Sequence, residues 1–257
     1  MKIVIVTQEE PFYIPLCLSE IIKAFSTEIA AIIALPGLPY GYNYLTYIKK
    51  LYDIFGLFDF IKYGFLFLQY KIYDYIDIKH NRFYSIKRAA QKNNIPFYAV
   101  KNINSTESYN LLNLLKPDYL VSIAAPQVFK KRIIDLAHHT VNIHGAKLPQ
   151  YQGMMPGYWV LAKGEKNTGV TMHYIDENID HGEIILQKEI EIAPNETFHS
   201  MQTKIALIGG LVIIEGIINL ESGKHDLIQP DIQTQSYYSL PTKEAAKEFK
   251  KRGHKLL

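Results

Sequence analysis

The sequence predicts an α/β fold with a Rossmann-like, mostly parallel sheet that is covered by helices. Two observations lead to this prediction. Short runs rich in β-branched residues alternate with amphipathic stretches along the first 145 residues, which is typical of parallel sheets flanked by helices. The chain has 257 residues, of which 48% are hydrophobic and 21% charged, so one large domain with a sizeable core is expected.

Hydrophobic periodicity locates the expected helices and strands along this part of the chain. Helices are expected near residues 14–25, 105–115 and 127–137. Pro96 and Pro117 stand just before two strands and end the preceding helices. The expected strands cover residues 2–7, 29–35, 97–100, 119–123 and 140–143.

The first expected strand is not followed by a dinucleotide-binding loop. VTQEEPFYIP stands where a GxGxxG fingerprint would be needed. A nicotinamide cofactor is therefore not expected.

An aromatic-rich insertion interrupts the alternation between residues 36 and 80. Lysines and aspartates break it up, so no uncharged run approaches the ~20 residues needed to cross a bilayer, and no transmembrane segment is expected. We interpret it as a helical pair that packs on the domain or on a second copy of it, which leaves a homodimer open. The alternative is an aromatic surface that meets a membrane or a partner.

The remaining chain predicts two more strands, an apolar helix and a tail. GVTMHYID and EIILQKEIEI are strand-like, residues 197–220 are an apolar helical stretch, and a proline opens a charged helix in SYYSLPTKEAAKEFKKRG. We therefore expect a catalytic domain over residues 1–220, with the insertion at about 36–80, and a short C-terminal extension over 221–257.

Charge and cysteine content limit the partners and the compartment. The net charge of +3 is mild, unlike the basic stripe of a protein that neutralises many phosphates, so nucleic acid is not an expected partner. Cys17 is the single cysteine and the start MKIVIVT lacks the regions of a secretory signal. A cytoplasmic protein is expected.

The stretch NIHGAKLPQYQG carries the first candidate site residues. Asn142 and His144 lie two positions apart at the end of a strand, so their side chains share one face. Ligands of open α/β sheets bind beyond the carboxyl ends of strands. The simpler alternative is that Asn142 forms a turn and His144 is satisfied by a backbone carbonyl.

A second motif favours a site at Asn142 and His144 over the simpler alternative. IDENIDHGEI places Asp176 and Asp180 in a loop between two strands. A carboxylate beside His144 would orient the imidazole and raise its pKa, and an amide side chain could donate to a developing oxyanion. This set lacks an activated nucleophile, so it suits acyl transfer to an external amine. No metal site is expected, because the histidines show no HExxH spacing or cysteine support.

These motifs, in this order and with GVTMHYID between them, resemble the 10-formyltetrahydrofolate-dependent formyltransferase family. The family includes methionyl-tRNA, glycinamide ribonucleotide and sugar N-formyltransferases. The likeness is strongest from about residue 118 to 220 and does not include the insertion. It implies the formyltransferase fold, 10-formyltetrahydrofolate as the co-substrate, and Asn142, His144 and Asp180 as the catalytic residues. His181 departs from the family pattern, in which a small residue or threonine is common.

The resemblance also implies that the pterin is bound largely through backbone groups of two segments. The corresponding cofactor-binding residues here are Ala125, Pro126, Gln127, Val128, Asp176 and Ile179. Pro126 also has a local interpretation, because proline is common at the first position of a helix.

Within the family, a nucleotide-linked amino sugar is the acceptor that we expect. Methionyl-tRNA formyltransferases resemble the chain less, since they carry a C-terminal β-barrel where only a short tail follows here, and glycinamide ribonucleotide enzymes commonly read HPS where this chain reads HGA. Trp159, in GMMPGYW, matches aromatic positions of some sugar enzymes, but it could equally pack in the core. Two alternatives remain: hydrolysis of 10-formyltetrahydrofolate, and a catalytically silent binding protein that uses the aromatic insertion.

Overall fold

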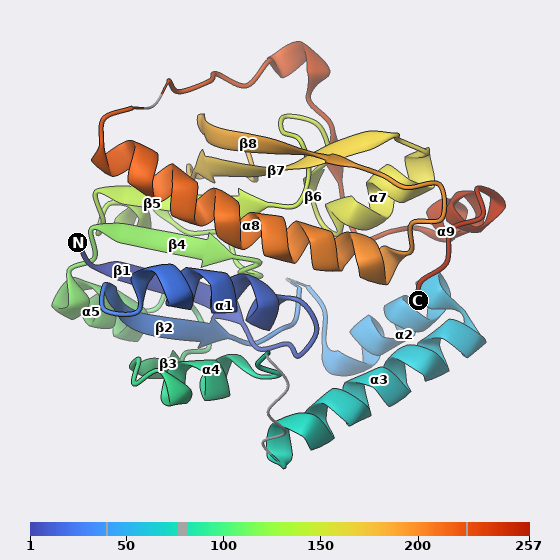
Figure 1. The fold of residues 1–257 in the computed structure, drawn as a ribbon, viewed down its shortest axis with the longest axis horizontal. Coiled ribbons are helices and arrows are strands. Elements are labelled where there is room, and N and C mark those ends of the chain that lie inside the picture. The colour runs from blue at the N-terminus through green and yellow to red at the C-terminus, as the bar shows by residue number, and fades with distance from the viewer. Residues whose placement is uncertain (40, 77–81, 225) are drawn as a thin grey trace.

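The computed structural model describes residues 1–39, 41–76, 82–224 and 226–257. A seven-stranded sheet runs through the molecule in the order β3-β2-β1-β4-β5-β7-β8 (Figure 1). The first five strands of this order are parallel, whereas β7 and β8 are antiparallel to their neighbours. The predicted α/β, mostly parallel sheet is confirmed. The strands are β1 (Ile3–Gln8), β2 (Ile29–Leu35), β3 (Phe97–Ala99), β4 (Tyr119–Ile123), β5 (His139–His144), β7 (Asn167–Tyr174) and β8 (Ile184–Glu191).

The sheet has a hydrophobic cluster on each face, and alternate residues of β1 supply them. Ile3 and Ile5 join the cluster under α1 (Ile14–Phe25), α4 (Ile86–Lys92) and α8 (Phe198–Glu221). Val4 and Val6 point to the opposite face, as the period of a strand requires, and pack with Leu112 of α5 (Thr106–Leu115) and Ile133 of α6 (Lys131–Ile134).

Helix α8 lies beside α1 across the sheet (Figure 1) and approaches it closely. A Cβ at Gly210 would stand 2.9 Å from the carbonyl oxygen of Cys17, and one at Gly216 would stand 2.2 Å from Met172 Sδ. Among the described residues α8 is also the one helix whose length and composition would allow it to cross a membrane. Its close packing on α1 and β7 is that of a core helix.

The predicted helix over residues 127–137 is wrong at both ends, because α6 covers only Lys131–Ile134. Side-chain hydrogen bonds between this segment and residues 101–104 explain the difference. The Gln127 side chain accepts from the Ile103 backbone amide at 2.9 Å and donates to the Lys101 carbonyl at 2.9 Å, and Asn104 Nδ2 donates to the Val128 carbonyl at 2.9 Å. These contacts hold the segment after Pro126 outside a helix, so Pro126 does not begin one.

The insertion forms the expected helical pair, α2 (Tyr44–Phe55) and α3 (Leu57–Tyr75). Asn43 caps α2 and exchanges hydrogen bonds with Thr46, as in a capping box. Gly56, at φ +78°, separates the two helices. Figure 1 places α3 at the edge of the molecule, outside α2. Tyr40 and residues 77–80 of the predicted insertion lie outside the described residues.

The C-terminal segment folds back over residues 152–163. Its strand β9 (Tyr237–Tyr238) pairs in parallel with β6 (Gln152–Gly153). Its helix α9 (Lys243–Lys251) packs on α7 (Pro156–Lys163), with the rings of Tyr158 and Phe249 stacked at 4.6 Å. The helix is capped by Thr242, so the preceding proline stands just before it. A short 3-10 helix, η1 (Ile232–Thr234), precedes β9.

Candidate active site

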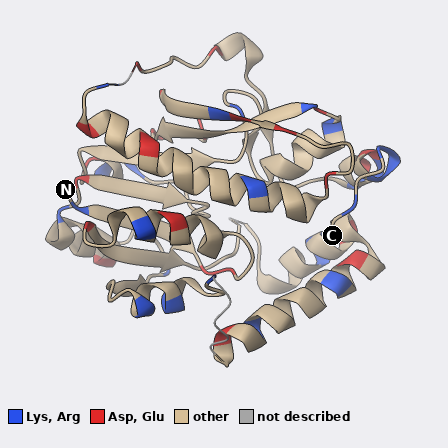
Figure 2. Cartoon of the chain, in the orientation of Figure 1, with Lys and Arg blue, Asp and Glu red and all other residues tan. Residues whose placement is uncertain are grey.

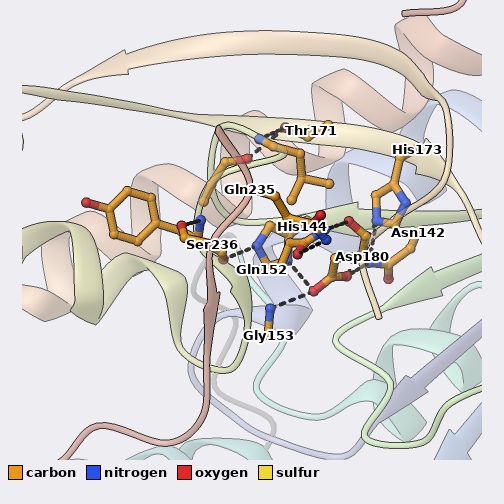
Figure 3. A network of polar contacts seen from close by, with 12 residues as sticks. Asn142, His144, Gln152, Gly153, Thr171, His173, Asp180, Gln235 and Ser236 are labelled. Carbon is orange, nitrogen blue, oxygen red and sulfur yellow. Dashed lines mark hydrogen bonds and ion pairs between the residues drawn. The ribbon is translucent and has the colours of Figure 1, made fainter. Parts of the chain in front are cut away.

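The site is built where β5 meets the antiparallel strand β7. Their register sets Asn142 opposite His173, and His144 opposite Thr171. The side chains of Asn142, His144 and His173 gather around the carboxylate of Asp180, which belongs to the loop after β7 (Figure 3). Asp180 has a φ of +50°, a left-handed conformation that aspartate tolerates better than most residues.

Both carboxylate oxygens of Asp180 are engaged. Oδ1 accepts a hydrogen bond from Asn142 Nδ2 at 3.3 Å, and Oδ2 lies 3.3 Å from His144 Nδ1. The amide of Gly153 donates to Oδ2 at 2.9 Å. The structure therefore brings together the three residues that were predicted to be catalytic.

The environment of Asp180 favours its ionised form. Burial alone would raise the pKa of this carboxyl group, but the charge of His144, the hydrogen bond and charge of His173, and the Gly153 amide outweigh burial and lower the pKa well below its usual range. The side chain is only 12% exposed, so these partners act with little screening by water. Asp180 is a fixed anion at neutral pH.

Both ring nitrogens of His144 face acceptors. Nδ1 points to the Asp180 carboxylate, and Nε2 lies 2.8 Å from the carbonyl oxygen of Tyr151. An imidazole can donate at both nitrogens only when it is protonated, so this arrangement suits the imidazolium form. In the simpler interpretation, a backbone carbonyl satisfies His144. The Tyr151 carbonyl does contact His144, but the Asp180 carboxylate contacts it as well.

His173 is a site residue that the sequence interpretation missed. Its Nε2 lies 3.1 Å from Asn142 Nδ2 and 3.5 Å from Asp180 Oδ1, and its Nδ1 lies 2.8 Å from the Tyr174 carbonyl. The side chain is 2% exposed. The sequence did carry a signal, because side chains alternate along the strand in GVTMHYID and this places His173 on the same face as Thr171. Only the pairing of β7 with β5, however, brings that face to Asn142.

Two glutamines connect the site to the C-terminal segment. Gln152 donates to the Asp180 carbonyl at 2.7 Å and accepts from Gln235 Nε2 at 2.9 Å. The Tyr151 amide donates to Ser236 Oγ at 2.9 Å. The residues that touch His144 and Asp180 are thus themselves held by residues 235–236 (Figure 3).

The residues predicted to bind the pterin lie in two loops next to the site strands. The first loop follows β4, whose Ile123 pairs with Ile143 of β5. Its Gln127 side chain is hydrogen-bonded to the backbone of residues 101 and 103, and Val128 is 49% exposed. Ala125 and Pro126 are partly buried beside them. Their part in cofactor binding stays a prediction.

The second loop leads into Asp180. Asp176 accepts from the Asn178 amide at 2.7 Å and lies 2.9 Å from His181 Nδ1. Burial works against the ionised form of Asp176, but the contacts with His181 and Asn178 prevail and lower its pKa. Ile179 is 43% exposed. His181, which departs from the family pattern, therefore ties this loop to Asp176 rather than entering the Asp180 cluster.

Two further features bear on the predicted site. In the part of the chain that the structure describes, no group of three or more His, Cys, Asp or Glu side chains is arranged to hold a metal. Trp159 is 8% exposed, its Nε1 donates to the Ser239 carbonyl at 2.9 Å, and its ring lies 4.7 Å from that of Tyr238. The core interpretation of Trp159 is the one that the structure supports.

Methionyl-tRNA formyltransferases are among the sequence relatives of the chain. The methionyl-tRNA formyltransferase of Alkaliphilus oremlandii is 32% identical over 163 residues, which are 63% of this chain and 53% of that protein. The bifunctional polymyxin resistance protein ArnA of Wigglesworthia glossinidia brevipalpis is 38% identical over 124 residues, which are 48% of this chain and 19% of that protein. The chain spans about half the length of the methionyl-tRNA formyltransferases that it matches.

Solved structures share the fold. The sugar 3N-formyltransferase WlaRD, solved in the presence of dTDP and 5-N-formyl-THF, has a TM-score of 0.59 and 20% identity, and the match covers 93% of this chain and 69% of that one. The phosphoribosylglycinamide formyltransferase of Streptococcus pneumoniae has a TM-score of 0.58 and 15% identity, with 86% and 99% covered. The family model described as formyl transferase matches residues 77–217, more than half of the chain. The chain therefore belongs to the formyl transferase family.

Proposed function

We propose that the protein transfers a formyl group from 10-formyltetrahydrofolate to a primary amine, and that the amine belongs to a nucleotide-linked amino sugar. The observation that carries the transfer chemistry is the convergence of Asn142, His144 and Asp180 at the end of β5, at distances of 3.3 Å from the Asp180 carboxylate to each of the other two. Family membership supports the choice of the folate as donor.

The reaction forms one carbon–nitrogen bond and breaks another. The neutral amine of the acceptor attacks the formyl carbon, the carbonyl oxygen becomes an oxyanion, and the bond from that carbon to N10 of the folate then breaks. Asn142 donates a hydrogen bond to the oxyanion, in place of its present contact with Asp180 or His173. A preorganised donor of this kind contributes about 3–4 kcal/mol to lowering the barrier.

His144 and Asp180 act as a pair in this scheme. The ionised carboxylate keeps the imidazolium of His144 in place beside the reacting carbonyl, and the Tyr151 carbonyl fixes the ring from its other nitrogen. One proton must pass from the attacking amine to the departing N10. Because the lowered pKa of Asp180 makes it a poor proton donor at neutral pH, we assign that transfer to Nε2 of His144. In this scheme Nε2 leaves its contact with the Tyr151 carbonyl, gives its proton to N10 directly or through a water molecule, and then takes the proton of the attacking amine.

Two considerations support a sugar nucleotide as the acceptor. WlaRD and the N-formyltransferase of Helicobacter canadensis, the latter solved with folinic acid and dTDP-3-aminofucose, share the fold over 93% and 96% of this chain. Lys and Arg are also interspersed with Asp and Glu along the ribbon (Figure 2), and the net charge is +3. A large nucleic acid is better bound by a face on which positive charge is concentrated.

Methionyl-tRNA is the second candidate acceptor, because the methionyl-tRNA formyltransferases are relatives at 31–33% identity. Glycinamide ribonucleotide is the third, from the shared fold. A silent binding protein is the alternative of another class, and it would leave the paired carboxylate and imidazoles without a use.

One experiment separates these alternatives. The protein is incubated with 10-formyltetrahydrofolate and, separately, with nucleotide-linked 3-amino and 4-amino sugars, glycinamide ribonucleotide and methionyl-tRNA, and the products are weighed by mass spectrometry. The expected result is a gain of one formyl group on a sugar nucleotide, formed about 10²–10³-fold more slowly by Asn142→Ala. Product on another acceptor would overturn the choice of sugar. The absence of product with every acceptor, together with unaltered folate in the mixture, would overturn formyl transfer itself.

A further inference from the structure

Helix α3 is apolar on two opposite faces. The inner face carries Phe60, Tyr63, Phe67 and Tyr70, at spacings of three and four residues. Phe12 of the loop after β1 holds it, with ring centroids 5.8 Å from Tyr63, 6.2 Å from Phe67 and 5.7 Å from Tyr70. The helix docks on the domain through this face, of which Tyr63 is buried and Phe67 remains 40% exposed.

The outer face repeats the same spacing but meets solvent. Its members alternate at steps of three and four residues, which is the a/d pattern of a helix that packs against another helix. A helix that covers a domain with one face normally presents polar residues on the other. We call these six residues the outer seam: Phe58 (79% exposed), Ile61 (45%), Phe65 (69%), Leu68 (56%), Ile72 (56%) and Tyr75 (85%).

Two further features of the insertion are exposed. On α2, Leu45, Ile48 and Tyr52 are 80%, 48% and 44% exposed at the same three- and four-residue steps, and the Tyr52 ring also lies 5.7 Å from that of Phe60 on the inner face of α3. On α3, Gly64 lies three residues after Ile61 and four before Leu68, and a Cβ there would meet nothing within 4 Å. Glycine inside a helix costs about 1 kcal/mol relative to alanine, and here it leaves room for another backbone to approach the seam.

We propose that the outer seam is covered by the same seam of a second copy of this chain, in a two-fold symmetric dimer. In a two-fold interface the same surface of each copy must fit against itself. A regular apolar seam meets this requirement when the two α3 helices pack side by side. Large apolar side chains present roughly 150–250 Å² each when fully exposed, and these six are on average about two-thirds exposed. Covering them would therefore remove on the order of 700 Å² per copy, close to the ~800 Å² per partner of a stable interface.

The charges of the insertion favour a second copy over a membrane. Residues 44–76 contain four lysines and three aspartates. Each aspartate is paired, Asp53 with Lys243 at 3.5 Å, Asp59 with Lys62 at 3.8 Å and Asp74 with Arg88 at 3.0 Å. A helix that lies on an anionic membrane usually has a strongly basic polar face. The net charge of residues 44–76 is only +1, so the insertion lacks such a face and two identical copies would repel each other weakly.

The test measures molecular mass by size-exclusion chromatography with light scattering over a range of protein concentrations. The wild type should have the mass of a dimer, and Phe65→Glu should raise the dissociation constant by at least about 30-fold, because a central aromatic anchor is removed from both copies. Leu114→Glu is the matched control, since Leu114 is 79% exposed on α5, away from the seam, and should leave the mass unchanged.

Other outcomes would overturn the proposal. A monomer at all concentrations would do so, as would a dimer that Phe65→Glu does not weaken. Sedimentation of the wild type with phosphatidylglycerol vesicles, but not of Phe65→Glu, would show that the seam meets a membrane instead. If circular dichroism shows that Phe65→Glu is misfolded, Leu68→Ser provides the same comparison with a smaller change. None of these measurements depends on catalysis, so they stand apart from the proposed function.

Discussion

Replacing Asp180 by asparagine tests the proposed chemistry most directly. Asparagine keeps the size of the side chain and tolerates the left-handed backbone at this position, where φ is +50°. The substitution removes the negative charge that faces His144. It also sets an amide beside groups that now donate to a carboxylate, among them the Gly153 amide at 2.9 Å.

The size of the effect follows from the distance between the two groups. His144 Nδ1 lies 3.3 Å from Asp180 Oδ2. Two unit charges at that distance attract each other by about 5 kcal/mol at an effective dielectric constant of ~20. If this attraction stabilises the imidazolium in the transition state, its loss lowers kcat by about 5 × 10³-fold.

The assay follows formylated product with the acceptor that the panel identifies, and it measures kcat and KM separately. Asp176→Asn is the matched control, because Asp176 is a partly exposed carboxylate in the same loop that pairs with His181 rather than His144. It should retain kcat within about tenfold. A kcat for Asp180→Asn within tenfold of the wild type, with the fold intact, would refute the role of the His144–Asp180 pair.

Four further predictions follow from the same contacts. Asn142→Ala should lower kcat by about 10²–10³-fold in the product assay while changing KM little; a large rise in KM alone would contradict an oxyanion role. Gln235→Ala removes one hydrogen bond to Gln152 and should lower kcat by up to about tenfold, whereas Gln233→Ala should not. Gly153→Ala should lower the free energy of unfolding in urea by about 2 kcal/mol or more, since its Cβ would stand 2.2 Å from the Tyr238 carbonyl; Gly253→Ala is the control, since Gly253 has a similar φ of +84° with nothing within 4 Å of its Cβ, and an equal loss there would contradict this reason. The pKa of Asp180 is lower in the folded protein, so its contribution to stability is present above the unfolded pKa of about 4 and is lost as pH falls through the folded pKa; Asp180→Asn should flatten this acid limb in melts across pH, and an unchanged limb would contradict it.

The parallel part of the fold could be predicted because each element has a strong local signal. The helix expected at residues 14–25 and the strand at 29–35 match α1 and β2 in full. The prediction of secondary structure fails where a polar side chain hydrogen-bonds to the backbone of a distant segment. Gln127 was assigned to a helix, but its amide is bound to residues 101–103, and no periodicity in the sequence reveals such a contact.

The site was predictable where its residues are close in sequence, and less so where strands or segments must meet. Asn142 and His144 follow from the two-residue step of a strand. His173 required the knowledge that β7 runs antiparallel beside β5 in this register. Gln235 required knowledge of the path of the C-terminal segment, which lies 83 residues from Gln152 in sequence.

That long-range contact has a consequence for how the protein is made. Residues 1–180 contain Asn142, His144 and Asp180, yet Gln152, which contacts Asp180, gains its Gln235 partner only later in synthesis. A nascent chain that has not yet exposed residues 235–238 lacks both this partner and the strand that pairs with β6. We expect the site to mature late, when residues 235–238 leave the ribosome, and not when Asn142, His144 and Asp180 are first made.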